Sequence, residues 1–250
     1  MRQISKDGSI NETMIITTLN GHYYKDLNPK WKKHIKRMFK NIEDNDYIIA
    51  TYYEHKDAKP DIVIYAKNRK VLLSIKSGHA PTMHEEPIKT FFDFLRSLYV
   101  PERIIKIIAF YHYGYSLTKR VSDHILSREE IIERFPKQIK EVNDYFRKHA
   151  EIVHEIVYRS IIRGRLKRDL IDYFYYGSPA RGFLLSSRDI ITLITSDPNE
   201  ECESICFGSL TYVSRARNKN KEADKHRLKI NWPVLCKWYY DENFMERYGW

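Results

Sequence analysis

Cysteine is scarce in this sequence of 250 residues, which contains only Cys202, Cys206 and Cys236. A set this small and odd in number argues against a scaffold held by disulfides and is typical of proteins from a reducing compartment. Cys202 and Cys206 together with His226 suggest a zinc site at first sight, but their spacing is loose and no compact ligand set completes it. We therefore expect neither a disulfide scaffold nor a structural zinc ion.

Long apolar runs are missing from the sequence as well. No stretch approaches the roughly 20 residues that a membrane-spanning helix needs. The polar N-terminal segment, Met1–Asp7, does not resemble a signal peptide. Repeats and low-complexity segments are also absent. These absences predict a cytoplasmic protein that does not enter a membrane.

The chain has an excess of positive charge. Its 43 Lys and Arg residues against 33 Asp and Glu residues give a formal net charge of +10. Hydrophobic residues make up 42% of the chain, which is enough to form a core. A basic excess of this size predicts a polyanionic partner, most often nucleic acid, although a basic protein without such a partner has the same composition.

Three clusters of basic residues are candidates for contact with phosphate. One follows a predicted helix over residues 30–40, and the others lie at 163–168 and 215–221. From these clusters we select Lys33, Lys36, Arg37, Arg165, Arg215 and Arg217 as nucleic-acid-binding residues. Each cluster alone is typical of a solvated surface, whereas the three together with the net charge favour binding to a phosphate backbone.

The first part of the chain predicts a regular order of helices and strands. Apolar spacing indicates helices over 10–20 and from Pro29 to Lys40, and then an antiparallel meander of three strands, Tyr47–Tyr53, Pro60–Ala66 and Lys70–Lys76. A helix from Pro87 to Tyr99 should start at His84–Pro87, because proline favours the first helical position. Ile104–Tyr111 is nearly all apolar, as a central strand is. The fold class is therefore α/β (α+β), with a central mixed sheet flanked by helices.

Beyond residue 120 the pattern changes. Helices are predicted at Arg128–Arg134 and Lys137–Arg163, and strands at Ile205–Val213 and His226–Trp232. Residues 170–195 fit either a strand or a pair of short helices. We place a soft boundary near residue 120, between a core of residues 1–120 and an α+β extension of residues 121–250, although one continuous domain is also compatible with the pattern.

One group of residues in the predicted meander carries chemistry. Asp61 follows Pro60 at the start of the second strand, and Ser74 and Lys76 share one face of the third, because side chains alternate along a strand. If the two strands pair, a carboxylate, a hydroxyl and an amine meet near one edge of the sheet. Carboxylates bind Mg²⁺, which activates water for attack on phosphate, and a nearby lysine can orient that water or offset the charge of the transition state.

These residues and the element order resemble the PD-(D/E)xK nuclease superfamily, which has the restriction-endonuclease-like fold. The resemblance spans residues 8–112 and depends on Pro60-Asp61, on Ser74-Ile75-Lys76 and on the order helix, three strands, helix, strand. It implies that Asp61 and Lys76 are catalytic and that Asp61 binds the metal. Ser74 departs from the pattern, because an acidic residue normally stands at its position.

The resemblance also points to replacement acids for the one missing at Ser74. Some members of the superfamily with serine at this position take the carboxylate from the following helix. Here that implies Glu85 or Glu86, at the predicted helix start, of which we favour Glu86 as a metal ligand. Glu12 on the first helix is a further candidate for the metal, and His79 in the loop after Lys76 is a candidate for contact with phosphate. The alternative is that Glu85 and Glu86 only complement the helix dipole.

The sequence thus leads to a main hypothesis and two alternatives. The main hypothesis is a Mg²⁺-dependent endonuclease, with Mn²⁺ able to substitute, that acts on double-stranded DNA as a restriction or defence enzyme. Enzymes that cut both strands of a duplex commonly work as dimers, so a homodimer is compatible with it. The first alternative is a non-catalytic nucleic-acid-binding module on the same fold. The second is an interaction protein with no role in nucleic-acid chemistry.

Overall fold

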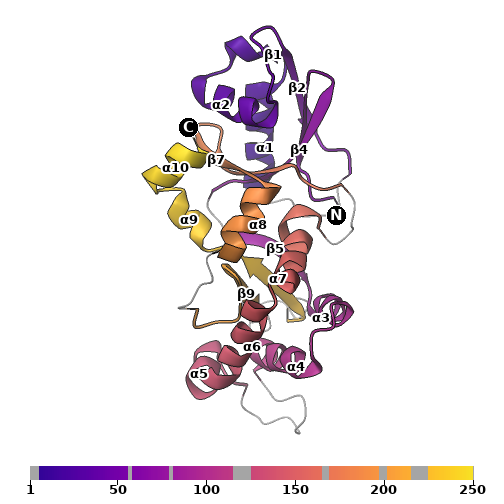
Figure 1. Cartoon of the computed structure of the whole chain (residues 1–250), viewed down its shortest axis with the longest axis vertical. Coiled ribbons are helices and arrows are strands. Elements are labelled where there is room, and N and C mark those ends of the chain that lie inside the picture. Colours follow the sequence, from indigo (N-terminus) through magenta and orange to yellow (C-terminus); the bar gives the residue numbers. More distant parts are fainter. Residues whose placement is uncertain are drawn as a thin grey trace. The chain divides into compact units, whose positions relative to one another are not determined.

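The chain folds into two compact units of the α+β class (Figure 1). The computed structural model describes residues 6–55, 58–78, 81–114, 125–164, 169–196, 202–214 and 225–249. Unit 1 comprises residues 1–81, 158–192 and 234–250, and unit 2 comprises residues 82–157 and 193–233. Each unit therefore combines segments from both halves of the sequence, and this division does not coincide with a boundary near residue 120.

Unit 1 is built on a mixed sheet with the strand order β1-β2-β3-β4-β6-β7. The strands are β1 (His22–Tyr23), β2 (Tyr47–Tyr52), β3 (Ile62–Ala66), β4 (Arg69–Lys76), β6 (Tyr173–Ser178) and β7 (Arg181–Ser186). Only β4 and β6 run parallel among these neighbours, and all other pairs are antiparallel. The predicted meander of β2, β3 and β4 is confirmed. Its β3–β4 hairpin turns at Lys67 and Asn68, which both adopt positive φ, as a tight hairpin turn requires.

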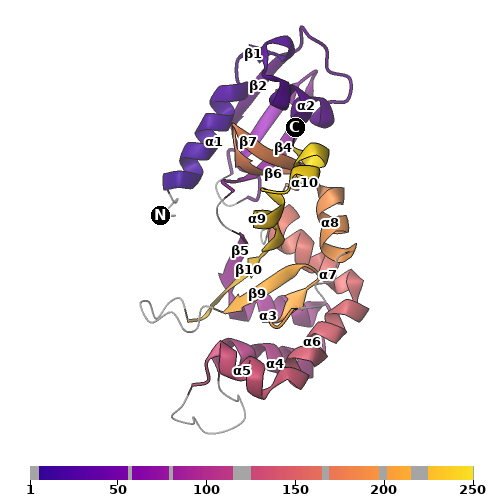
Figure 2. The ribbon, with the colours of Figure 1, turned by 90° about the vertical axis from the view of Figure 1, so that its left-hand side faces the viewer.

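The N-terminal helices cover one face of this sheet. They include α1 (Lys6–Leu19), which runs beside β1 and β2 (Figure 2), and α2 (Pro29–Met38). The Asn28 side chain accepts a hydrogen bond from the Trp31 backbone amide at 3.0 Å, and Pro29 occupies the first turn, so α2 begins where the sequence predicts. The core between helices and sheet is apolar and includes Ile15, Leu19, Trp31, Ile35, Ile48, Ala50, Ile64, Val71, Leu73 and Ile75. Every second residue of β2, β3 and β4 points toward this core, and those buried in it are apolar.

Further elements complete unit 1. They are a short 3₁₀ turn, η1 (Tyr24–Asp26), a π-helical turn, η2 (Tyr158–Ile162), and the helices α8 (Ser187–Ser196), α9 (Val234–Trp238) and α10 (Glu242–Tyr248), of which α8 ends beyond the limit of the unit. Helix α10 packs against β7 and α9 (Figure 1). The segment between residues 170 and 195, for which the sequence left two possibilities, forms the hairpin β6–β7 followed by a helix.

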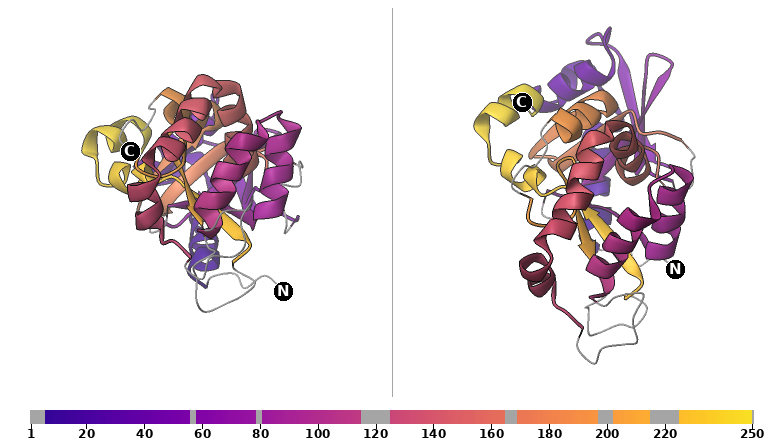
Figure 3. Two further views of the ribbon diagram at one scale, coloured as in Figure 1. Left: turned by 90° about the horizontal axis from the view of Figure 1, so that it is seen from below. Right: turned by 60° about the horizontal axis from the view of Figure 1, so that its bottom comes forward.

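Unit 2 contains a second, antiparallel sheet with the order β5-β10-β9-β8. Its strands are β5 (Thr82–Pro87), β8 (Cys206–Phe207), β9 (Leu210–Ser214) and β10 (Arg227–Asn231), and its helices are α3 (Ile88–Ser97), α4 (Glu102–Tyr113), α5 (Arg128–Arg134), α6 (Pro136–Lys148) and α7 (Ala150–Val157). Helices α3, α4 and α6 pack against this sheet (Figure 3). Aromatic rings of Phe91, Phe146, Phe207 and Tyr212 form the contact between the two layers. The helices predicted at Arg128–Arg134 and Lys137–Arg163 are confirmed, the second in three consecutive pieces.

The prediction of a strand at Ile104–Tyr111 was wrong, because this segment lies in α4. Pro101 precedes the helix, and Gly114 ends it in the left-handed conformation with φ +77°. The buried residues Ile104, Ile108 and Tyr111 recur at helical spacing, so an apolar run that suits a central strand also suits a buried helix. The strand next to β4 in the sheet is instead β6, which comes about 100 residues after β4.

The predicted helix start at His84–Pro87 was wrong as well. These residues belong to β5, and α3 begins only at Ile88, whose backbone amide donates to the carbonyl of His226. The strand forms because β5 pairs with β10, where Glu86 lies opposite Leu228. Proline at position 87 gave a local helix signal, and pairing with a distant strand overrode it. Among the described residues, no helix is both long enough and apolar enough to cross a membrane.

Candidate functional site

Asp61 lies directly before β3 and faces β4. Its carboxylate oxygen Oδ2 accepts hydrogen bonds from the Ser74 hydroxyl at 3.0 Å and from the Ile75 backbone amide at 2.6 Å. Its own backbone amide donates to the carbonyl of Leu73, and its carbonyl accepts from the amide of Tyr53. Asp61 is therefore held on both sides, and its carboxylate contacts the hydroxyl of Ser74. The expected approach of Asp61 to Lys76 stays a prediction.

Lys76 shares a sheet face with this pair. The register of β3 and β4, in which Ile62 lies opposite Leu73, puts Asp61 level with Ser74. Lys76 comes two residues after Ser74 and so points to the same side of the sheet. Its other neighbour is Tyr176 of β6. We call this side, opposite the one covered by α1 and α2, the Asp61 face.

The carboxylate of Asp61 also has a structural task. At the start of β3, Oδ2 accepts the hydrogen bond of the Ile75 amide, which would otherwise lose its partner where the ladder ends. Ser74 is buried, and its hydroxyl is satisfied by the same oxygen. The second oxygen, Oδ1, accepts no hydrogen bond from the part of the chain that the structure describes. One oxygen thus closes the ladder, and the other remains for a cation or a ligand.

A π-helical turn supports the segment before Asp61. The Lys59 amine donates to the backbone carbonyl of Ser160 in η2 at 2.7 Å, and the Arg163 amide closes the turn onto Tyr158 at 2.6 Å. Ser160 is fully buried. Such turns are rare in proteins, and those that occur are often found at functional sites. The contact of Lys59 with Ser160 escaped sequence reasoning, because the two residues lie 101 positions apart.

Two further acidic residues approach the Asp61 face. Asp172 stands directly before β6, and its Oδ2 accepts from the amide of Leu72 at 2.8 Å. Asp169 accepts a hydrogen bond from the hydroxyl of Tyr53, and that bond lowers the pKa of the Asp169 carboxyl. Sequence reasoning missed both acids. The available signal for Asp172 was its position before an aromatic strand, but the parallel pairing of that strand with β4 was not foreseen.

The proposed replacement acids lie in β5 of unit 2, not at a helix start. Glu85 accepts a hydrogen bond from Arg227 Nε at 2.8 Å, and its other oxygen is 3.9 Å from Lys229 Nζ. Glu86 is buried, with Oε1 3.2 Å from His84 Nε2. Because Asp61 belongs to unit 1, a role for either glutamate beside Asp61 stays a prediction.

Glu12 lies on α1, half-buried, next to a residue that contacts the sheet. Its neighbour Asn11 donates from Nδ2 to the carbonyl of Gly177 at 2.9 Å, at the end of β6. Gly177 lies against Gly78, where a Cβ would come within 3.2 Å of the Gly177 Cα. The N-terminal half of α1 therefore reaches the ends of β4 and β6, while the role of Glu12 as a metal ligand stays a prediction.

The donors around Asp61 fit a loosely held Mg²⁺ and not a protein cage. Mg²⁺ is usually bound by one or two carboxylates, with water and substrate phosphate as the remaining ligands. Asp61 offers one carboxylate oxygen and Ser74 one neutral oxygen. Within the described ranges no group of three or more His, Cys, Asp or Glu side chains is arranged to hold a metal. The set is sufficient only if a phosphate and water molecules supply the other oxygens.

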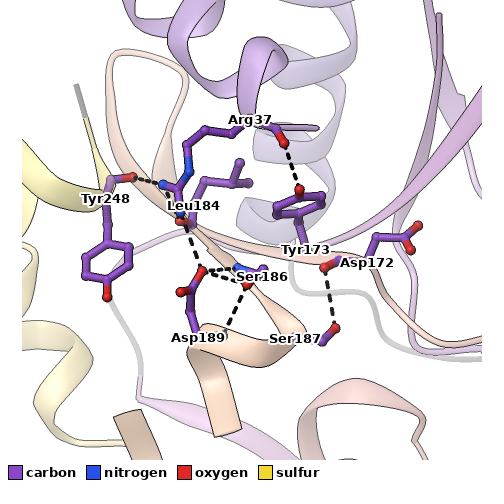
Figure 4. Close-up of polar contacts among 8 residues, drawn as sticks. All are labelled: Arg37, Asp172, Tyr173, Leu184, Ser186, Ser187, Asp189 and Tyr248. Carbon is purple, nitrogen blue, oxygen red and sulfur yellow. Dashed lines mark hydrogen bonds and ion pairs between the residues drawn. The ribbon is translucent and has the colours of Figure 1, made fainter. Parts of the chain in front are cut away.

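Two of the predicted phosphate-binding residues of α2 contact the protein itself. Arg37 donates from Nη1 to the carbonyls of Leu184 and Tyr248, and its Nη2 is 3.4 Å from Asp189 Oδ2 (Figure 4). Lys33 donates to the carbonyl of Glu246 at 2.8 Å. Both residues therefore join α2 to the C-terminal segment of unit 1, while Lys36 is exposed. Nucleic-acid binding at these positions stays a prediction.

The remaining predicted nucleic-acid-binding residues lie outside the described parts of the chain, and two of the three cysteines are bonded to each other. His79, Arg165, Arg215 and Arg217 lie outside the described residues. Cys202 and Cys206 form a disulfide, which the sparse cysteine count did not predict, although one bond across four residues is no disulfide scaffold. The Nδ1 atom of His226 lies 3.1 Å from the hydroxyl oxygen of Tyr113. A disulfide uses both thiols, so no zinc site forms from Cys202 and Cys206.

No protein-family model matches this sequence, and none of the curated proteins compared with it matches either.

Proposed function

We propose that this chain is a metal-dependent nuclease whose phosphodiester-cleaving site is on the Asp61 face of unit 1. One observation carries the proposal. The carboxylate of Asp61, the hydroxyl of Ser74 at 3.0 Å and the amine of Lys76 share one face of two paired strands. A carboxylate that can bind a metal ion and a lysine that can offset charge on a phosphate both support hydrolysis of a phosphodiester by a metal-activated water.

The fold in this proposal is the restriction-endonuclease-like core. It is supported by a helix followed by the antiparallel meander β2–β3–β4, and by a later strand, β6, that pairs parallel to β4. Unit 2 enters between β4 and β6, so the core is interrupted in sequence. The additional elements of unit 1, from β7 to α10, extend this core.

Each residue has a separate role in the proposed site. Ser74 and the Ile75 amide fix Asp61 through Oδ2, which leaves Oδ1 to bind Mg²⁺, or Mn²⁺ in its place. The ion, when bound, would act as a Lewis acid on the phosphate and would lower the pKa of a bound water molecule. The Lys76 amine offsets negative charge on the phosphate as the transition state forms and can orient the attacking water. DNA is the proposed substrate, because the net charge of +10 favours a polyanion.

A second candidate, a nucleic-acid-binding module without catalysis, is favoured by one observation. The hydrogen bond from the Ile75 amide at 2.6 Å gives Asp61 a purely structural reason to be present. With Ser74 in place of a second acid, unit 1 offers a single carboxylate on β3 and β4. The two candidates differ in whether the charge of Asp61, and not only its shape, is needed.

Asp61→Asn separates these two candidates. An asparagine oxygen can still accept from Ser74 and Ile75, so the ladder is preserved while the charge is lost. We expect the unmutated protein to nick and cleave supercoiled DNA with Mg²⁺ or Mn²⁺, and Asp61→Asn and Lys76→Met to lose cleavage while they bind DNA in Ca²⁺. Lys89→Ala, at an exposed lysine of α3, is the control. Tight binding of DNA without cleavage by the unmutated protein would establish the binding module instead.

A further inference from the structure

The Asp61 face extends beyond Asp61 into a row of exposed aromatic and apolar side chains. The register places Tyr23 of β1 opposite Tyr47 of β2, and Ile49 of β2 opposite Tyr65 of β3. Side chains that lie opposite each other in paired strands point to the same side of a sheet. Tyr65 is four residues from Asp61 along the chain, so it also points to that side, about 13 Å away at ~3.3 Å per residue.

These side chains are open to solvent. The exposed fractions are 45% for Tyr23, 49% for Tyr47, 47% for Ile49 and 42% for Tyr65. Farther along the same face, Val63 and Leu72 are buried, with 4% and 6% exposed. The large exposed side chains of this face therefore lie at its β1–β2–β3 end. Large apolar side chains in a contiguous exposed group commonly mark a binding surface.

The chemistry of this surface fits nucleic acid better than protein. Strands β1 to β4 contain no acidic residue at all. Lys70 lies opposite Tyr65 in β4, and the Lys25 amine is 5.6 Å from the centre of the Tyr23 ring. Of the acids in the flanking turns, Glu43 and Asp46 are bridged by Lys67, at 3.0 and 3.4 Å, whereas Asp26 and Asp44 beside Lys25 are exposed. Aromatic rings interleaved with lysines are the usual surface for bases and their phosphates.

We propose that Tyr23, Tyr47, Ile49 and Tyr65 form a stacking surface for the unpaired bases of single-stranded nucleic acid. Bases inside a duplex stack on each other and cannot lie against a sheet, whereas unpaired bases stack on aromatic rings with little regard to sequence. Tyr23 and Tyr47, with ring centres 5.3 Å apart at 68°, offer one edge and one face to a base. Lys25 and Lys70 contact the adjacent phosphates.

A nucleic-acid strand that continued from this surface toward Asp61 would pass Val63 and Leu72, whose side chains are buried. The proposal rests on the proposed function only for this continuation, since stacking itself needs no metal and no cleavage. It makes single strands, or duplexes with unpaired ends, the preferred substrate class. Pairing of two copies through the same surface is less favourable, because a twofold contact brings Lys25 and Lys70 of both copies together with no acid from these strands between them.

The test is binding of a fluorescent oligothymidylate of about 12 nucleotides, measured by anisotropy in EDTA so that no cleavage occurs. We expect single strands to bind more tightly than a duplex of the same length. Tyr47→Ala and Tyr65→Ala should each weaken single-strand binding about tenfold, while Tyr47→Phe and Tyr65→Phe, which keep the ring, should bind as the unmutated protein does. Tyr240→Ala, at a tyrosine that is 70% exposed elsewhere in unit 1, is the control.

Three results would overturn the proposal. The first is that single strands and duplex bind with equal affinity and that neither Tyr47→Ala nor Tyr65→Ala changes this affinity. The second is an equal loss of affinity in the alanine and phenylalanine variants, since the rings would then not be the contact. The third is a dimer in sedimentation that the alanine variants dissociate without any change in oligothymidylate affinity, which would assign the surface to a second copy. Loss of cleavage with intact single-strand binding would refute the nuclease and leave the stacking surface standing.

Discussion

The Asp61 carboxylate accepts a hydrogen bond from the backbone amide of Ile75 at 2.6 Å. At the start of β3, a side chain thus takes the place of a main-chain carbonyl. The same oxygen also satisfies the buried hydroxyl of Ser74. One carboxylate therefore stabilises the sheet through Oδ2 and can serve chemistry through Oδ1. Any substitution of Asp61 must be judged on both counts.

The structural contribution of Asp61 can be measured apart from its charge. Asp61→Ala leaves the buried amide of Ile75 and the Ser74 hydroxyl without their acceptor, which costs about 1–3 kcal/mol of the free energy of unfolding. Asp61→Asn keeps an acceptor at that place, so its loss of stability should be clearly smaller. Urea unfolding of both variants at pH 7 is the measurement. Equal destabilisation by alanine and asparagine would show that the hydrogen bonds to Oδ2 contribute little.

Stability should fall below pH 6.5 because of His34. Burial, together with the positive charges of Arg37, Lys33 and Lys30, lowers the pKa of His34 to about 3. Its ring packs against Trp31 and Tyr175, and its Nδ1 has no hydrogen-bond partner among the described residues. Between pH 6.5 and 3 the unfolded chain therefore binds a proton that the folded protein does not, so the free energy of unfolding decreases as the pH falls.

The expected size is about 1.4 kcal/mol per pH unit in this window, or about 2 kcal/mol between pH 6.5 and 5. His34→Phe keeps an aromatic ring beside Trp31 and removes the titrating group. Between pH 6.5 and 5, the free energy of unfolding of this variant, measured with urea, should therefore fall by about 2 kcal/mol less than that of the unmutated protein. The same pH dependence in both proteins would place the titrating group elsewhere.

The disulfide between Cys202 and Cys206 makes two of the three cysteines unreactive. Alkylation without reductant should modify only Cys236, and alkylation after reduction should modify all three. The closed loop is short, with a sequence separation of four, so the bond should contribute only about 2 kcal/mol. Asn143 also holds this loop, through Cys206 N at 3.0 Å and the Ser204 carbonyl at 2.9 Å.

Cys206→Ser should accordingly lower stability by about 2 kcal/mol without unfolding the protein, while Cys236→Ser is the control for the substitution itself. Thermal unfolding with and without reductant provides the comparison. A reductant that changes the unmutated protein and Cys206→Ser equally would show that the bond does not form in solution.

Local signals predicted much of unit 1. The alternation of Ile48 and Ala50 with exposed neighbours, the Asn28–Pro29 start of α2 and the short link between β3 and β4 each depend on residues close in sequence. The contact of Asp61 with Ser74 follows from the same alternation once β3 and β4 pair as a hairpin. These features could be predicted from the sequence because the interactions that stabilise them join residues close together in the chain.

Pairing between distant segments decided the rest. Pro87 favours a helix start, but β10 arrives about 140 residues later and draws Glu85 and Glu86 into a strand. Ile104–Tyr111 is nearly all apolar, which suits both a buried helix and a central strand. The place beside β4 is taken by β6, which comes about 100 residues later. The contacts of Lys59 with Ser160 and of Asp172 with Leu72 likewise connect residues about 100 positions apart.

Ser74 stands where a second metal-binding acid would be needed, so another residue must provide that acid. Glu86→Gln removes a buried charge and keeps an acceptor for His84, so the variant should fold, and we expect it to lose cleavage if Glu86 completes the metal site. Glu85→Gln weakens the contact with Arg227 and should reduce cleavage less. Ser74→Glu returns a carboxylate to β4 and should restore part of the activity of Glu86→Gln. Circular dichroism checks folding, and cleavage of supercoiled DNA with Mg²⁺ is the readout. Full activity of both glutamine variants would show that the acid comes from elsewhere, with Glu12 the next residue to substitute.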